Sequence, residues 1–291
     1  MPKLKFGHLQ KNVFSYPQNF MSIKINHKTY KAIIFDVDDT LIDTSKSYDV
    51  AIKKTVKNFT SVNVSDEHLS LVRSNGLSYG VNNDWNVTWL LIQLVKTVKT
   101  FPINNWKTIL TSQVIDKINP NSKEYLEIQA FFQNIYLGNP HFNGQGLVDT
   151  AEDKMYADNF FPTLKTLGVK IAVVTSRPSE EALYTLKEIN ALVGDFIESE
   201  YFIICANSRN ANGQFLAEKP SPVPILECVQ RLNLGFKDCV YIGNSSSDYI
   251  AARDAQVDFI QVGSSQIERC EGDEADGFNY FQVESVNDVQ S

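Results

Sequence analysis

Two aspartates separated by a single residue, Asp36 and Asp38, are the side chains best suited to chemistry in this sequence. They directly follow the apolar run 32–35, which reads as a buried strand. In an extended chain, residues i and i+2 face the same side, so both carboxylates can enter one pocket. Two carboxylates this close tend to ionise at different pH values, which suits a nucleophile beside a general acid/base. The alternative interpretation is an acidic turn after a strand.

Five short apolar runs indicate the strands that must position these side chains. They cover residues 32–35, 169–174, 201–204, 239–242 and 259–262. Amphipathic helical patterns lie between the later runs, for example at Ile225, Val229 and Leu232. Strands that alternate with helices predict an α/β fold, a Rossmann-like, doubly wound parallel sheet with helices on both faces. Ligands bind at the carboxyl ends of such strands, which is where Asp36 lies.

Residues 46–136 have apolar residues at helical spacing and no convincing strand. The simplest architecture is therefore an all-α cap domain inserted after the first strand of the core. We predict a basic N-terminal extension at 1–30, a core domain at 31–45 and 145–291, and a helical cap domain at 46–144. Four stripes support the cap: 52/56/59, 85/89/92/95, 106/109/110/114/118 and 128/131/132/135.

The charge of the 291-residue chain is unevenly distributed, although the formal net charge is only −7. The first 35 residues carry six Lys and neither acid nor Arg, so the rest of the chain carries −13. A net-acidic chain is a poor general nucleic-acid binder, because phosphate contacts need Lys and Arg. No apolar run is long enough to predict a transmembrane helix. We expect residues 1–30 to be a flexible or loosely docked tail, with organelle targeting as the alternative.

Four cysteines, at 205, 228, 239 and 270, lie in the last third of the chain and form no C-x-x-C pair. This is neither a disulfide framework nor a zinc pattern, so we expect buried, reduced thiols in a cytoplasmic protein. The signatures of P-loop, dinucleotide-binding and zinc-protease sites are also missing from the sequence.

Three further motifs follow Asp36 along the chain. They are Val-Val-Thr-Ser-Arg at 173–177, Glu-Lys-Pro at 218–220 and Tyr-Ile-Gly-Asn-Ser-Ser-Ser-Asp at 241–248. Together with Phe-Asp-Val-Asp-Asp-Thr at 35–40, they resemble the four motifs of the haloacid dehalogenase superfamily of aspartate-nucleophile phosphotransferases. The resemblance covers about residues 31–265. A helical insertion between motifs one and two resembles subfamily IA, and the stretches 43–48 and 82–85 resemble an uncharacterised clade of that subfamily.

The resemblance implies a role for each motif residue. Asp36 would attack the phosphoryl group, and Asp38 would protonate the leaving alcohol and then activate water. Lys219 would neutralise developing charge, while the Thr175 hydroxyl and the Ser176 backbone N–H would hold the phosphoryl oxygens. Mg²⁺ would be bound by four residues, namely Asp36, Asp38 (backbone carbonyl), Asn244 and Asp248.

Asn244 departs from the family pattern, which usually has Asp at this position of motif four. An amide still offers a neutral oxygen, so we expect weaker Mg²⁺ binding, or a direct role for Asp248 in its place. Arg177 either gathers an anionic substrate or forms a salt bridge on the surface. In the cap, Asp84 is placed to N-cap a helix. Resemblance alone suggests that Asn83 and Trp85 face the active site and bind substrate.

These residues predict a Mg²⁺-dependent phosphatase that acts on a small phosphorylated metabolite through an aspartyl-phosphate. The cap would exclude water and bulky substrates, which argues against phosphoprotein substrates. The acidic net charge and the lack of a long apolar run predict no nucleic-acid or membrane partner. Phosphomutase or 2-haloacid dehalogenase chemistry is the alternative within the fold. Asn244 motivates another alternative, a weakly active or non-catalytic protein that binds a phosphometabolite. Whether the protein is a monomer or a homodimer is left open.

Overall fold

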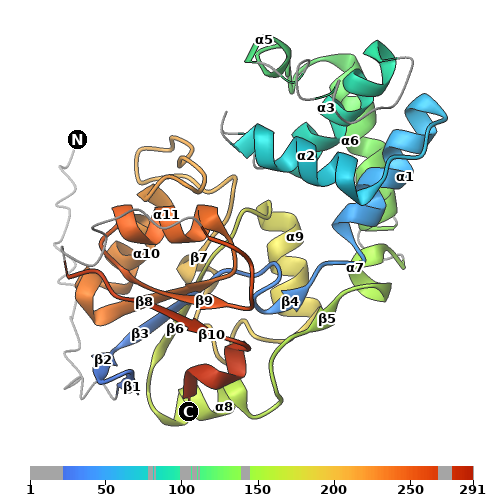
Figure 1. The fold of residues 1–291 in the computed structure, drawn as a ribbon. Coiled ribbons are helices and arrows are strands. Elements are labelled where there is room, and N and C mark those ends of the chain that lie inside the picture. The colour runs from blue at the N-terminus through green and yellow to red at the C-terminus, as the bar shows by residue number, and fades with distance from the viewer. Residues whose placement is uncertain are drawn as a thin grey trace, which may run out of the picture.

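The computed structural model describes residues 22–77, 81, 83–98, 106, 110, 112–138, 145–267 and 277–290. These residues form an α/β core and a group of helices gathered to one side of it (Figure 1). Several positions that carry predictions, namely residues 1–21, Asn82 and Cys270, lie outside the described residues.

A six-stranded, all-parallel sheet forms the core, with the strand order β10-β9-β8-β3-β6-β7. The central strand β3 pairs with β6 on one side and with β8 on the other. This arrangement confirms the predicted doubly wound sheet, and all five apolar runs contribute strands to it. The strands are β3 (Ala32–Phe35), β6 (Lys170–Val174), β7 (Ile203–Ile204), β8 (Cys239–Gly243), β9 (Asp258–Val262) and β10 (Tyr280–Val283).

Helices cover both faces of the sheet, which explains why its central strands are apolar at every position. Successive residues of β3 point to opposite faces. Ile33 and Phe35 join a cluster with α8 (Phe160–Thr166) and α9 (Ser179–Leu183), which continues into a π-helical turn at Tyr184–Ile189. On the other face, Ala32 and Ile34 pack with α10 (Val223–Leu232) and α11 (Ser246–Asp254) (Figure 1).

The helices beside the core share a hydrophobic cluster of their own, built mainly from residues 48–148. Within it, α1 packs against α3 and α6, and α2 packs against α3. This cluster supports the proposal of a helical cap at 46–144. The helices are α1 (Tyr48–Thr60), α2 (Asp66–Leu77), α3 (Asp84–Thr97), α5 (Ser112–Ile115) and α6 (Lys123–Tyr136). None of the helices in the described part of the chain is long and apolar enough to cross a membrane.

The chain leaves the core and returns to it at neighbouring positions. Strand β4 (Ile42–Asp43) leads out toward α1, and β5 (Asp153–Lys154) follows α7 (Leu147–Thr150) on the way back. The two strands pair antiparallel, with Ile42 opposite Lys154. Both connections to the cap helices are therefore held together next to the turn that carries Asp36 and Asp38.

Residues 22–30, predicted as part of a loosely docked tail, instead form a hairpin of β1 (Ile23–Ile25) and β2 (Lys28–Tyr30). Ile23, Ile25 and Tyr30 are buried in the core cluster that also contains Phe35. The Tyr30 hydroxyl donates to the buried carboxylate of Asp258 at 2.7 Å, and Lys28 forms an ion pair with the same carboxylate. These contacts correct the prediction for residues 22–30.

Candidate active site

Asp36 and Asp38 lie in a tight turn directly after β3. The backbone N–H of Asp36 donates to the Ile242 carbonyl of β8 at 2.8 Å, which fixes the end of the strand. The Val37 carbonyl then accepts the N–H of Ile42 at 3.0 Å, so the chain folds back at once. This turn holds both carboxylates at the carboxyl edge of the sheet, as the sequence predicts.

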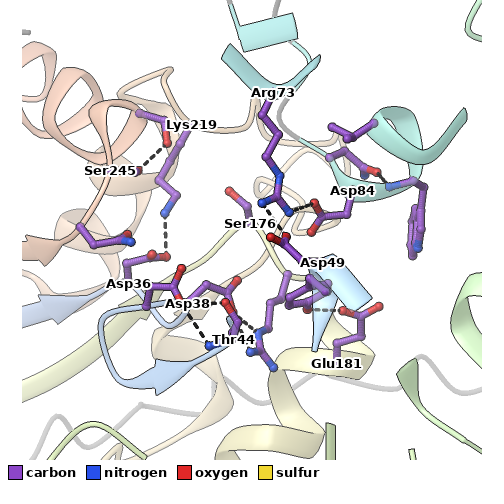
Figure 2. Close-up of a pocket in the computed structure, with 18 of the residues that line it drawn as sticks. Asp36, Asp38, Thr44, Asp49, Arg73, Asp84, Ser176, Glu181, Lys219 and Ser245 are labelled. Carbon is purple, nitrogen blue, oxygen red and sulfur yellow. Dashed lines mark hydrogen bonds and ion pairs between the residues drawn. The ribbon is translucent and has the colours of Figure 1, made fainter. Parts of the chain in front are cut away.

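A cavity of about 520 Å³ lies between this turn and the cap helices (Figure 2). Its wall combines core segments with residues of α1, α2, α3 and α6. Two of the predicted site residues, Thr175 and Asp248, are buried behind the wall. The other eight line the cavity: Asp36, Asp38, Asn83, Trp85, Ser176, Arg177, Lys219 and Asn244.

The Lys219 ammonium is buried between two carboxylates. Its Nζ donates to Asp36 Oδ1 at 2.7 Å and to Asp248 Oδ1 at 2.6 Å. Burial alone would lower the pKa of Lys219, but Asp248 and Asp36 outweigh burial and raise it. Burial and the charge of Asp248 raise the pKa of Asp36 to about 8, against the opposing effect of Lys219. A further cation beside Asp36 would favour its ionised, nucleophilic form.

The predicted metal ligand Asp248 faces Lys219 and the start of α11 instead of the cavity. Its Oδ1 also accepts the Tyr241 hydroxyl at 3.0 Å, and its Oδ2 accepts the hydroxyl and N–H of Ser245 at 2.6 and 3.0 Å. Burial would raise the pKa of Asp248, but Lys219 and Ser245 lower it. A Cβ on Gly243 would lie 2.7 Å from Asp248 Cγ, so glycine permits this close approach. The geometry makes Asp248 a partner of Lys219, and its role as a metal ligand remains a prediction.

Asn244, between β8 and α11, lines the cavity together with Ser245 and Ser247 of the same motif. Its neighbour Ser245 caps α11, because the Ser245 hydroxyl accepts the N–H of Asp248. In the described part of the chain, no cluster of three or more His, Cys, Asp or Glu is arranged to hold a metal ion. The oxygen donors beside Asp36 are the carboxylates of Asp36 and Asp38, together with amide, hydroxyl and backbone oxygens.

Thr175 and Ser176 directly follow β6, and Ser176 lines the cavity. The backbone N–H of Thr175 donates to the Ile204 carbonyl at 2.9 Å and extends the pairing with β7. The Thr175 hydroxyl oxygen accepts the N–H of Arg177 at 3.1 Å. The phosphoryl contacts assigned to Thr175 and Ser176 remain predictions.

Arg177 is buried, with 1% of its surface exposed, which overturns the alternative of a surface salt bridge. Its guanidinium forms ion pairs with Asp38 at 2.6 Å and Glu152 at 3.1 Å. Burial would lower the pKa of Arg177, but Asp38 and the surrounding tyrosines and acid raise it, so the side chain stays charged.

The cap contributes a polar wall opposite Asp36. Asn83, and not Asp84 as predicted, caps α3, because its side-chain oxygen accepts the backbone N–H of Trp85 at 2.8 Å. Asp84 instead forms an ion pair with Arg73 of α2 at 2.9 Å, and Arg73 also reaches Asp49 of α1 at 2.7 Å (Figure 2). One arginine thus links the first three cap helices at the cavity wall.

A family model described as haloacid dehalogenase-like hydrolase matches residues 30–256 of this chain. The match includes all four motifs that meet at the cavity. The chain is a haloacid dehalogenase-like hydrolase. The family resemblance noted in the sequence is therefore confirmed, and so is the assignment of the chain to the hydrolases.

Other members of the haloacid dehalogenase-like hydrolases are distant in sequence but similar in length. The phosphoglycolate phosphatase of Colwellia psychrerythraea is 20% identical over 230 residues, which cover 79% of this chain and 83% of that protein. The putative pyrophosphatase PpaX of Clostridium perfringens is 24% identical over 225 residues, 77% of this chain and 80% of that protein. A crystal structure of a putative phosphoglycolate phosphatase from Lactobacillus delbrueckii subsp. bulgaricus shares the fold, with a TM-score of 0.58 and 20% identity. The match covers 90% of this chain and 97% of that chain.

Sequence reasoning missed several polar residues that line the cavity of this hydrolase. Asp49, Arg73 and Glu181 are the charged ones that matter most to its electrostatics. They occur singly on helices, outside the four motifs, so their types and spacing gave no signal. A charged residue on an otherwise apolar helix stripe is the one feature that could have drawn attention to Arg73, beside Leu69 and Val72 on α2.

Proposed function

We propose that this hydrolase is a phosphatase that cleaves a small phosphorylated metabolite through an aspartyl-phosphate at Asp36, with Mg²⁺ as cofactor. The observation that carries the proposal is the convergence of Asp36, Asp38 and Lys219 on one cap-covered cavity. Phosphatase names among the distant relatives support it. The cavity volume of about 520 Å³ suits a metabolite-sized ligand.

In the first step, an Asp36 carboxylate oxygen bonds to phosphorus while the bond from phosphorus to the alcohol oxygen breaks. Asp38 gives its proton to that oxygen, so the alcohol leaves neutral. In the second step, Asp38 takes a proton from water as the water oxygen attacks phosphorus and releases Asp36 and inorganic phosphate. Lys219, 2.7 Å from Asp36 Oδ1, holds the nucleophile and offsets negative charge on the phosphoryl oxygens.

The donors at the cavity fit Mg²⁺, because all of them are hard oxygens and Mg²⁺ commonly keeps several waters. Asp36, the backbone carbonyl of Asp38 and the Asn244 amide oxygen would hold the ion. When bound there, Mg²⁺ supplies positive charge that favours ionised Asp36 and reduces its repulsion from the phosphate dianion. Asp248, enclosed by Lys219, Tyr241 and Ser245, supports this site from behind.

The test measures inorganic phosphate released from a panel of phosphate monoesters, with and without Mg²⁺. Wild-type protein should release phosphate in a Mg²⁺-dependent manner, and Asp36→Asn should lose at least about 10³-fold in rate. The matched control is Asp254→Asn, a partly exposed aspartate at the end of α11 that pairs with Arg253. If wild type and Asp36→Asn release phosphate equally slowly on every ester, the non-catalytic binding alternative suggested by Asn244 replaces this proposal.

We also propose that the protein acts in the cytoplasm on a small molecule and not on nucleic acid or a membrane. Among the described residues, the cysteines Cys205, Cys228 and Cys239 are free and buried, and reduced thiols are typical of that compartment. The net charge of −7 disfavours phosphate-backbone binding. Fractionation of the native protein, followed by assay of phosphate release, tests the location.

A further inference from the structure

All N–H groups of the Arg177 guanidinium are matched by contacts to other side chains of the protein. It has five N–H groups, and five contacts to oxygen atoms match them. Nε and Nη2 lie 2.7 and 2.6 Å from Asp38 Oδ1, and Nη2 lies 3.1 Å from Glu152 Oε2. Nη1 donates to the Tyr136 hydroxyl at 2.9 Å and to the Thr185 hydroxyl at 2.7 Å. A phosphate in the cavity would therefore have to displace a protein contact to reach Arg177.

The two acids on Arg177 differ in their access to the cavity. The Glu152 side chain is 2% exposed, whereas that of Asp38 is 30% exposed and lines the cavity wall. Arg177 itself has 0% side-chain exposure. Arg177 thus connects the buried carboxylate of Glu152 to the carboxylate of Asp38, which is the one of the two that can contact a substrate.

Glu152 is itself fixed by residues of the cap side. Its Oε1 accepts the hydroxyl of Ser47, just before α1, at 2.8 Å and the hydroxyl of Tyr136 in α6 at 2.9 Å. The Tyr136 ring stacks on Tyr48 of α1, with 4.4 Å between ring centroids. The position of the guanidinium is therefore determined by both segments that join the cap helices to the core.

We propose that Arg177 is a positioning residue that orients the Asp38 carboxyl for proton transfer to the leaving alcohol. This inference rests on the proposed phosphatase function. It also replaces the predicted role of Arg177 as a substrate ligand. Because proton donation matters most for alcohols that leave poorly as anions, loss of the orientation should slow alkyl esters far more than activated aryl esters.

Asp38 also serves the second step, which is the same for every ester, so the test compares the rate of the first step. This rate is measured as alcohol or p-nitrophenol released in a single turnover of an alkyl phosphate, such as glycerol 3-phosphate, and of p-nitrophenyl phosphate. Arg177→Lys keeps the charge but loses the planar five-donor group. We expect it to lower the first-step rate on the alkyl ester by about 10- to 100-fold, to change p-nitrophenol release by less than about 3-fold, and to leave KM nearly constant. Asp38→Asn should show the same selectivity more strongly.

Arg231→Lys is the matched control, because Arg231 is a largely buried arginine that pairs with Glu227 away from the cavity. It should leave the ratio between the two esters unchanged. An equal loss on both esters in Arg177→Lys would show a merely structural role, and a rise in KM alone would show a substrate ligand. Either result overturns the inference.

A second variant, Glu152→Gln, keeps Arg177 and covers the case in which Arg177→Lys does not fold. Both carboxylate oxygens of Glu152 accept hydrogen bonds, and the amide of Gln has only one oxygen to replace them. We therefore expect a smaller loss that is again selective for the alkyl ester. An unchanged ester ratio in a folded Glu152→Gln protein contradicts the inference. If Asp38→Asn itself shows no alkyl selectivity, or wild type hydrolyses no ester, the proposed function fails. If Asp38→Asn is selective and Arg177→Lys is not, only the role of Arg177 fails.

Discussion

Asn244 lines the cavity, while Asp248, the acid of motif four, is turned toward Lys219. A cation bound beside Asn244 would therefore meet one negative charge fewer than it would beside an aspartate at that position. We predict that Asn244→Asp lowers the Mg²⁺ concentration needed for half-maximal activity by about 10-fold, because a carboxylate is a stronger Mg²⁺ ligand than an amide.

The measurement is phosphate release across a Mg²⁺ titration, alongside calorimetric titration of Mg²⁺ in the absence of substrate. Asn233→Asp, at the end of α10 and away from the cavity, is the matched control for the added charge. An unchanged or higher half-saturating Mg²⁺ concentration in Asn244→Asp would show that the amide is not placed to bind the ion.

Lys219 holds two buried carboxylates, so its removal affects folding as well as catalysis. Lys219→Met should abolish phosphate release and lower the free energy of unfolding by about 3–5 kcal/mol, the usual effect of leaving a buried charge unpaired. Without the ammonium, Asp36 and Asp248 should keep their protons to higher pH in the folded than in the unfolded protein. Stability should therefore fall further as pH rises above the ordinary carboxyl range.

Urea denaturation of Lys219→Met at pH 5 and pH 8 checks this sign. Lys187→Met removes an exposed lysine that pairs with Glu200, and it should change stability by less than about 0.5 kcal/mol. Equal destabilisation of Lys219→Met at both pH values would contradict the argument.

At the scale of elements, strands buried on both faces could be predicted from sequence, because every residue of β3 and β8 is apolar or small and buried. The edge strand β10 was not predicted, because its residues are mostly half-buried and do not alternate clearly between buried and exposed. Leu183, Leu186 and Ile189 stand at the spacing of one helix face, but the π-helical turn changes that spacing and leaves Ile189 41% exposed.

The four motifs identified the core wall of the site because the strand ends must meet at one edge of the sheet. The cap wall could not be derived in this way. The direction of Arg73 or Glu181 depends on how the helices pack over the core, and helical periodicity gives the buried face of a helix without its orientation.

Helix α9 offers a prediction for the contact between core and cap. The Glu181 carboxyl accepts the Tyr48 hydroxyl of α1 at 2.7 Å and the Gln133 amide of α6 at 2.6 Å. Burial raises the pKa of Glu181 from 4.5 to about 7. The folded protein then binds more protons than the unfolded chain between those two pH values, so this group makes stability fall as pH rises through that window.

Glu181→Gln should remove this contribution and flatten the dependence of unfolding free energy on pH between 4.5 and 7 by about 2–3 kcal/mol. Denaturant unfolding at closely spaced pH values measures the slope. Glu188→Gln, an exposed acid in the adjoining π-helical turn, should leave the slope unchanged. A slope in Glu181→Gln equal to that of wild type would show that Glu181 ionises normally in the folded protein.

Considered as a whole, the molecule places the sheet edge that carries Asp36 opposite a wall formed by the cap helices, and the cavity between them has more acidic than basic side chains. The cavity is lined by six acidic side chains and three basic ones. Each base is already paired: Lys219 with Asp36, Arg177 with Asp38, and Arg73 with Asp49 and Asp84. The two cap acids give the wall around Arg73 a net negative charge, and Trp85 adds an aromatic surface beside it.

This charge balance predicts discrimination between substrates. A phosphate ester whose alcohol carries a carboxylate brings a second negative charge toward Asp49 and Asp84, and like charges in a partly buried site repel strongly. We predict that kcat/KM for phosphoglycolate is at least about 10-fold lower than for a monoester of similar size whose alcohol is uncharged, such as glycerol 3-phosphate. Steady-state kinetics on the two esters at equal Mg²⁺ provide the comparison.

The double variant Asp49→Asn/Asp84→Asn should reverse this preference, because it leaves the Arg73 guanidinium charged and without its two carboxylate partners (Figure 2). An arginine released in this way binds a carboxylate with two parallel hydrogen bonds. The ratio of kcat/KM for phosphoglycolate over glycerol 3-phosphate should therefore rise in the variant, and added salt should reduce the change. A wild-type preference for phosphoglycolate, or a ratio that the double variant leaves unchanged, would show that the cap wall does not contact the alcohol end of the substrate.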